Sequence, residues 1–286
     1  METNATPSTS LVTRPSAEVS TGEISGEISG VTLKYLKPTY GVGGQHELGF
    51  DEGSLVLDGK YAVASKKVPA PVIIIGATQY CKDWMTAAAF AAGLKSQRYA
   101  NLAAAKAAGK RVDWVDNPNG SMNPVTGRPA RLGPEVTQVY DLRVLVRKPA
   151  MVTDAKGNEV NADPEFYLRI GEHFYAPACI SFEKMAYKPL SEVLTNSRIM
   201  AMQEQKVSLG QAKLHNWIYT LGTTLLPSKP SCMAALIPEL RRMQDPVTKR
   251  GAVLSGEDVA ELEGLMAALN NASAGAGEAP ADDANP

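Results

Sequence analysis

Hydrophobic and polar residues alternate along much of the middle of the chain with a period of two, which is typical of β-strands. In EVTQVYDLRVLVRKP, one face carries Tyr140, Leu142, Val144 and Val146, and the other carries Asp141, Arg143, Leu145 and Arg147. The segment 72–77 is a continuous apolar run, which predicts a strand in the centre of a sheet.

Further strands are predicted on both sides of these two. In VTLKYLKP, Val31, Leu33 and Tyr35 alternate with Thr32, Lys34 and Leu36. Two hairpins are predicted, one turning at Asp58-Gly59 and one at Gly171-Glu172. Two more strands are expected at residues 112–115 and in LHNWIYTLGTTLL.

Three helices are predicted. An alanine-rich helix ends at Gly109, a second helix begins at Pro189 and ends near Lys206, and a third covers residues 255–271. The third has an apolar stripe of Val259, Leu262, Leu265, Met266 and Leu269. This stripe indicates either a helix docked on the body of the protein or a contact between two copies of the chain.

Many short strands and few helices predict a mainly β protein, a β-rich α+β fold with an antiparallel barrel or sandwich and helical insertions, at residues 31–254. The ends at residues 1–30 and 272–286 are rich in small and polar residues, which predicts a disordered arm and a disordered acidic tail. The turn-rich segment 116–134 predicts an exposed loop.

Charge is segregated along the chain, although the net charge is only -1. Residues 31–254 hold 28 basic and 19 acidic residues, whereas residues 255–286 hold seven acids and no Lys or Arg. A basic body attracts phosphates, and an acidic tail can compete for the same surface. An ordinary solvated surface with scattered charge is the alternative.

Motifs of enzyme chemistry are missing from the sequence. Gly76 is not followed by the further glycines of a dinucleotide site, and neither a phosphate-binding P-loop nor a GxSxG elbow occurs. The three histidines and three cysteines lack metal-ligand spacing. We therefore expect a protein that is not an enzyme, with no cofactor, no metal and no membrane span, in a reducing cytoplasm.

Aromatic residues are interleaved with cations on several predicted strands, which is the combination that single-stranded nucleic acid needs. Rings stack on bases while cations follow the backbone. The candidate binding residues are Tyr80, Lys82, Trp84, Arg143, Arg147, Arg169, Tyr187 and Lys188. Tyr80, Lys82 and Trp84 share one side of their strand if the strand extends that far. The alternative is ordinary sheet-face residues beside cations with long apolar stems.

The order of GSLVLDGKY, APVIIIGATQYCKDW, YANLAAAKAAG, VYDLRVLVRKP and FYLRIGEHFYAPACISFEKMAYKPLSEVL resembles a group of tailed-bacteriophage proteins considered to be single-stranded DNA-binding proteins of OB-fold type. The resemblance covers about residues 31–238. It implies an OB-like barrel that coats exposed single strands during phage DNA replication or recombination, with weak sequence preference, in the cytoplasm of the bacterial host. It also implies an acidic tail that recruits replication or recombination proteins, although this tail ends in Asn-Pro rather than in an aromatic residue.

Two other functions stay open at this point. One is a non-enzymatic phage virion or tail accessory protein that assembles as a homo-oligomer through the C-terminal helix. The other is an enzyme whose site is assembled from residues distant in sequence.

Overall fold

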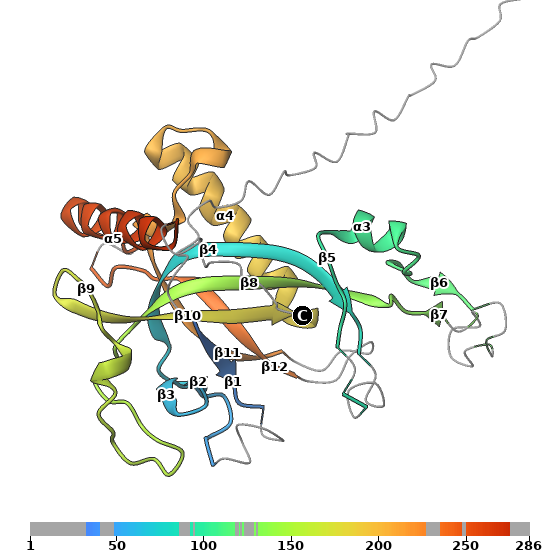
Figure 1. Ribbon diagram of the computed structural model, residues 1–286, viewed down its shortest axis with the longest axis horizontal. Helices are drawn as coiled ribbons and strands as arrows, with labels where there is room; N and C mark the ends of the chain where they lie inside the picture. Colours follow the sequence, from blue (N-terminus) through green and yellow to red (C-terminus); the bar gives the residue numbers. More distant parts are fainter. Residues whose placement is uncertain are drawn as a thin grey trace, which may run out of the picture.

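The computed structural model describes residues 33–40, 49–85, 92–93, 95–117, 120, 122, 129, 131–226, 235–247 and 250–274. In this part of the chain a ten-stranded sheet curls strongly into a half-barrel, with few helices around it (Figure 1). The strand order is β12-β11-β4-β8-β10-β1-β2-β3, with β5 added beside β4 and β9 beside β10. The strands of this sheet are β1 (Lys34–Pro38), β2 (Leu55–Leu57), β3 (Tyr61–Ala64), β4 (Ala70–Asp83), β5 (Arg98–Tyr99), β8 (Val136–Arg147), β9 (Leu168–Ile170), β10 (His173–Glu183), β11 (Ile218–Leu226) and β12 (Ala235–Arg242).

The three long strands β4, β8 and β10 lie side by side and antiparallel, and they form the wall of the half-barrel. Their inner face carries the large apolar core, to which β8 contributes Tyr140, Leu142, Val144 and Val146. The opposite face is here called the outer face. The predicted division of β8 into two faces and the central position of β4 are confirmed.

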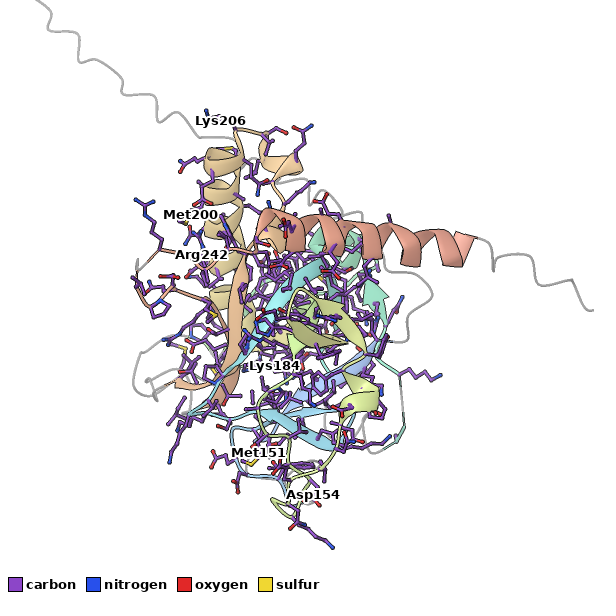
Figure 2. All side chains as sticks on the ribbon, turned by 90° about the vertical axis from the view of Figure 1, so that its left-hand side faces the viewer. Met151, Asp154, Lys184, Met200, Lys206 and Arg242 are labelled. Carbon is purple, nitrogen blue, oxygen red and sulfur yellow. The ribbon has the colours of Figure 1, made fainter. Side chains whose placement is uncertain are left out.

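Two long helices complete the body. Helix α4 (Tyr187–Gln205) buries Leu190, Leu194 and Ala201 in the inner core and packs against β12. Figure 2 shows Met200 of α4 beside Arg242 of β12, whose guanidinium donates a hydrogen bond of 3.2 Å to the Met200 sulfur. Helix α5 (Gly256–Ala274) lies across one end of the sheet in the same view. No helix in the described ranges is long and apolar enough to cross a membrane.

Helix α5 covers one half of the outer face. Its fully buried Leu262 and its Met266 contact Ile73 and Ile75 of β4 and Leu145 of β8 in a second apolar cluster. The start of the helix is capped by Ser255, whose hydroxyl accepts a hydrogen bond of 3.0 Å from the Asp258 amide. The apolar stripe therefore docks on the body of the same chain.

A smaller lobe projects from the far end of β4 and β8 (Figure 1). It holds α3 (Leu102–Ala107) and the short strand pair β6 (Val115–Asp116) and β7 (Arg131–Leu132). The predicted stop of α3 is confirmed, since Gly109 has φ +80°. The predicted strand at 112–115 is wrong except at its last residue, because the chain pairs only from Val115 onward.

Both predicted hairpins are confirmed, with positive φ at Asp58, Gly59 and Gly171 in their turns. The expected phase of β1 is reversed: Leu36 is buried in the core, whereas Tyr35 is 54% exposed on the outer face. Strand β12 was not predicted, because Pro238 interrupts its strand signal. It lies at the end of the strand order, where a missing backbone N–H is tolerated.

The predicted arm at 1–30 lies outside the described residues, and so does the tail from residue 275 onward. Helix α5 continues to Ala274, three residues beyond the predicted end at 271. 

Candidate nucleic-acid interface

A β-bulge in β4 decides which of its side chains reach the outer face. Ile74 lies opposite Val144 and Gly76 lies opposite Arg143, so Ile75 is the additional residue. Ile73 and Ile75 face α5, and beyond the bulge Gly76, Thr78, Tyr80 and Lys82 continue on the same face. The prediction that Tyr80 and Lys82 share a side is confirmed.

Six of the aromatic and basic side chains on the half of the outer face that α5 leaves open are here called the outer-face strip. They are Tyr80, Lys82, Trp84, Arg98, Arg143 and Lys184. Four of these side chains are cations, and the described carboxylates beside them include Asp83, Asp141 and Glu183.

Tyr80 is held between a cation and a carboxylate. The Arg98 guanidinium lies 4.8 Å from the centroid of its ring. Partial burial raises the pKa of Tyr80 to about 12, and the charge of Asp141 adds to that increase. The ring is therefore neutral at physiological pH, and its hydroxyl keeps its proton.

Trp84 follows the end of β4 and is 48% exposed. The Lys184 ammonium lies 4.7 Å from the centroid of its ring. Lys184 has φ +54°, a left-handed backbone that a non-glycine residue adopts at a cost of about 1–2 kcal/mol. Both residues line an open cleft of about 460 Å³, together with Lys82, Thr137 and Glu183.

Lys82 reaches across β8 to β10, where its ammonium lies 2.6 Å from the Glu183 carboxylate. Val139 of β8 is directly opposite both Tyr80 and Glu183 and is fully buried. The ion pair between Lys82 and Glu183 therefore lies above the apolar side chain of Val139. An anion that binds Lys82 must compete with Glu183.

Arg143 lies at the start of the open half, opposite Gly76 and next to the bulge. Its guanidinium donates a hydrogen bond of 3.3 Å to the Thr78 hydroxyl, and its stem passes over Gly76. Cys179 lies opposite Arg143 on β10, and burial raises the pKa of its thiol to about 11, with Asp141 adding to the effect. Cys179 is a buried, protonated neighbour of the strip rather than a nucleophile.

The structure places two predicted residues far from the strip. The Arg147 guanidinium donates to His173 at 2.8 Å, and Arg169 donates to the Gly171 carbonyl at 2.9 Å. Both lie at the end of the sheet that α5 covers. Arg169 is opposite Phe174, nine residues from Glu183 along β10, which is roughly 30 Å.

The two predicted residues of α4 do not join the strip as a pair. Tyr187 stacks on Tyr140 of the inner face at a centroid distance of 5.0 Å and accepts hydrogen bonds from Gln79 and Gln138. Burial raises the pKa of Tyr187. Lys188, the next residue, is exposed in the first turn of the helix.

Three residues near or in the interface were not selected from the sequence. Arg98 reaches Tyr80 only because β5 pairs with β4, and Lys184 reaches Trp84 from its position directly after β10. Tyr35 is available on the outer face because Leu36, rather than Tyr35, enters the core. The sequence signal for all three is a basic or aromatic residue beside a strand end.

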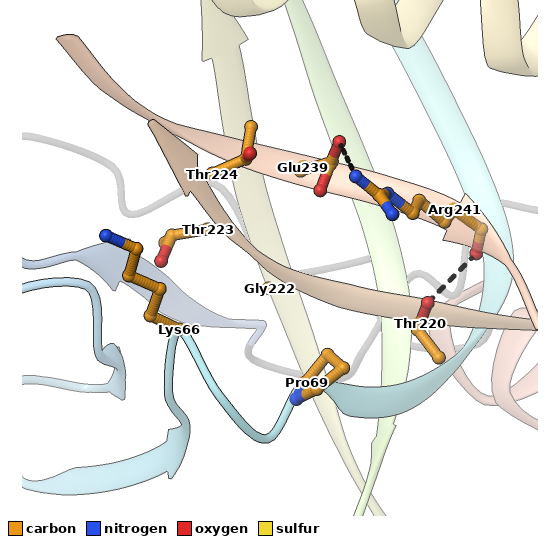
Figure 3. Close-up of a pocket in the computed structure, with 8 residues that line it drawn as sticks. All are labelled: Lys66, Pro69, Thr220, Gly222, Thr223, Thr224, Glu239 and Arg241. Carbon is orange, nitrogen blue, oxygen red and sulfur yellow. Dashed lines mark hydrogen bonds and ion pairs between the residues drawn. The ribbon is translucent and has the colours of Figure 1, made fainter. Parts of the chain in front are cut away.

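A second hollow of about 270 Å³ lies at the seam of the half-barrel, where β11 passes the connection between β3 and β4 (Figure 3). Its Arg241 is 2.8 Å from Glu239, and its Thr220 hydroxyl donates to the Arg241 carbonyl at 3.4 Å. No residue predicted to bind nucleic acid lines this hollow.

Within the described ranges, no group of three or more His, Cys, Asp or Glu side chains is placed to hold a metal ion. Comparisons of the chain with protein families, with curated proteins and with solved structures find no match.

Proposed function

We propose that the protein binds single-stranded nucleic acid along the open half of its outer face and coats exposed strands with weak sequence preference. The observation that carries the proposal is the outer-face strip. It gathers one tyrosine, one tryptophan and four cations on one side of the sheet, beside an open cleft of about 460 Å³.

The chemistry of the strip suits a ligand that has both flat bases and phosphates. Each base stacked on an aromatic ring contributes about 1–3 kcal/mol, whatever the base. A cation lies over the ring of Trp84 and another over the ring of Tyr80, and Trp84 is also 48% exposed, so a base can reach it. Arginine and lysine between the rings fit the phosphates.

Binding requires an exchange of partners at Lys82. A phosphate takes the place of Glu183, and the expelled carboxylate stays close to the incoming negative charge. The variant Glu183→Gln removes this competition. We expect it to bind an oligo-dT more tightly than wild type, with a salt dependence steeper by about 0.7 in the slope of log K against log[salt], because one more cation is free to release a counterion. An affinity equal to or below that of wild type contradicts the exchange.

The finer parts of the proposal come from the resemblance stated above. They are an OB-like identity for the half-barrel, a role in phage DNA replication or recombination, and a place in the host cytoplasm. The strong curl of the sheet supports the first, because OB folds are partly open barrels that bind oligonucleotides on their strands. DNA as the preferred strand and recruitment of replication or recombination proteins by the tail belong to the same proposal.

The direct test is a salt titration of binding to a fluorescent oligo-dT. We expect saturable binding at about 50 mM salt that weakens as salt is raised. A matched variant that combines Lys82→Gln, Arg143→Gln and Lys184→Gln should lose most of this salt dependence. Absence of binding by the wild type at about 50 mM salt contradicts the proposal.

The tail has a separate test, which the docking of α5 makes specific. Removal of all residues from 255 would also remove Leu262 from the apolar cluster, so truncation after Ala274 is the informative variant. It removes Glu278, Asp282 and Asp283 and keeps the helix. Under tail competition the truncated protein binds oligo-dT more tightly, and unchanged affinity contradicts that competition.

A further inference from the structure

The projecting lobe presents a second tryptophan to solvent. Trp114 is 59% exposed and lies beside Gly133, so close that a Cβ added to this glycine would come within 3.2 Å of the indole ring. Gly133 lacks a side chain, and the ring can therefore lie against the backbone on one side. The ring is more than half exposed, as a stacking platform for a base has to be.

Trp114 is connected to the outer-face strip by a short extended segment. The Trp84 amide donates to the Glu135 carbonyl at 2.7 Å, and the Glu135 amide donates to the Arg111 carbonyl at 2.7 Å. Gly133 precedes Glu135 by two residues, which is roughly 7 Å of extended chain. The two tryptophans therefore flank the same stretch of backbone, one at the end of β4 and one on the lobe.

Two cations next to Trp114 in the described part of the lobe are already paired with carboxylates. Arg131 lies 3.4 Å from Asp116 and donates to the Trp114 carbonyl at 2.7 Å, while Arg111 lies 3.5 Å from Glu135. Each of these cations beside Trp114 is thus paired with a carboxylate, whereas the strip holds four cations beside Asp83, Asp141 and Glu183. A nucleic-acid strand that contacts Trp114 is therefore expected to bind there by base stacking. Few of its phosphates would be neutralised, so few counterions would be released.

We propose that Trp114 is a second stacking platform for the same single strand, which extends the binding path from Trp84 onto the lobe. This inference rests on the proposed function. If Trp114 contributes, the bound strand must be longer than one that contacts the outer-face strip alone. The affinity that Trp114 adds comes from ring stacking rather than from charge.

Oligonucleotide length separates the two parts of the path. The test uses oligo-dT of about 6 and about 20 nucleotides, within and beyond the site sizes usual for one binding domain of this kind. For Trp114→Ala we expect an affinity for the longer oligonucleotide that is lower by about five-fold or more, and nearly unchanged affinity for the shorter one. The slope of log K against log[salt] stays that of wild type. Leu132→Ala, which removes an exposed apolar residue of the same lobe, is the matched control.

Intrinsic fluorescence gives an independent measurement, because the chain has three tryptophans and Trp217 is buried. In Trp84→Phe, the longer oligonucleotide should still quench part of the emission, and the further change Trp114→Phe should abolish that quenching. If wild type binds neither oligonucleotide, the proposed function itself fails. If wild type binds the longer one and Trp114→Ala binds it equally well, the strip remains and the extension onto the lobe is overturned.

Discussion

The outer face of the half-barrel has two halves that the same strands build in opposite ways. On one half, Ile73, Ile75 and Leu145 are apolar and lie under α5. On the other half, Tyr80 and Lys82 of the same strand β4 are left uncovered by the helix. The bulge at Ile75 lies at the boundary. Apolar side chains on a sheet face are stabilised when a helix buries them. The open half carries side chains with polar or charged ends, such as Tyr80 and Lys82, which can stay in contact with water.

This difference assigns stability to one half and binding to the other. Substitutions under α5 are expected to change the free energy of unfolding, and substitutions in the strip are expected to change affinity for nucleic acid. Each of the following variants tests that division.

The largest effect is expected for Leu262→Ala, which leaves a cavity under α5. The side chain is fully buried, so the free energy of unfolding should fall by about 2–4 kcal/mol in urea titrations. Affinity for oligo-dT should stay within two-fold of wild type. The control is Leu225→Ala, whose side chain is 50% exposed and whose removal should cost far less. Equal costs for the two variants would mean that α5 is not docked.

Trp84→Ala tests the open half. We expect a loss of about 1–3 kcal/mol in binding of oligo-dT, measured by fluorescence anisotropy, and little change in the free energy of unfolding. Phe174→Ala, which removes a ring of the same exposure outside the strip, should bind like wild type. A loss of affinity in both variants would show that ring removal anywhere on the surface has this effect.

Lys184→Gly should separate stability from binding in a single residue. Glycine relieves the left-handed backbone at φ +54°, so the protein should become more stable by up to about 1 kcal/mol. Binding should weaken, because the cation over Trp84 is lost. Lys206→Gly is the matched control, since Lys206 also has φ +54° but caps the end of α4. If both variants bind oligo-dT equally, Lys184 does not belong to the interface.

The smallest effect concerns the charges that hold α5. Hydrogen bonds from Lys213 and His215 lower the pKa of Glu263 below its ordinary value. A carboxylate with a lowered folded-state pKa stabilises the protein above its unfolded pKa of about 4.5, and this contribution is lost as the pH falls through the folded value. Glu263→Gln should therefore be slightly less stable than wild type at pH 7. In urea titrations the difference should shrink as the pH falls below the ordinary glutamate value, and a difference that is independent of pH would have another cause.

Period-two patterning predicted the long strands and the shared face of Tyr80 and Lys82, because those residues follow the bulge without interruption. It gave the wrong inward face for β1, since Tyr35 and Leu36 are both apolar enough to be buried. Arg98 and Lys184 were missed because their partners are distant in sequence and meet them only through strand pairing.

Closeness in sequence was misleading at Tyr187. The ring is next to Lys188, but the first turn of α4 directs it to the inner face, where two glutamine side chains and Tyr140 surround it. Arg147 and Arg169 were predicted to bind nucleic acid because they lie near aromatic residues in the sequence. In the structure, the length of β10 separates them from Glu183. The positions of both arginines along the strands place them outside the strip, and the amino-acid composition of a segment does not contain this information.

Photocrosslinking tests the central claim most directly, because it locates the strand on the protein. An oligo-dT that carries a photoreactive thymine analogue is bound to the full-length chain, crosslinked, and mapped by mass spectrometry of peptides. We predict crosslinks at Tyr80 and Trp84, with none in the peptides of α5 that contain Leu262. Crosslinks confined to other surfaces, such as the seam lined by Thr220 and Arg241, would contradict the account.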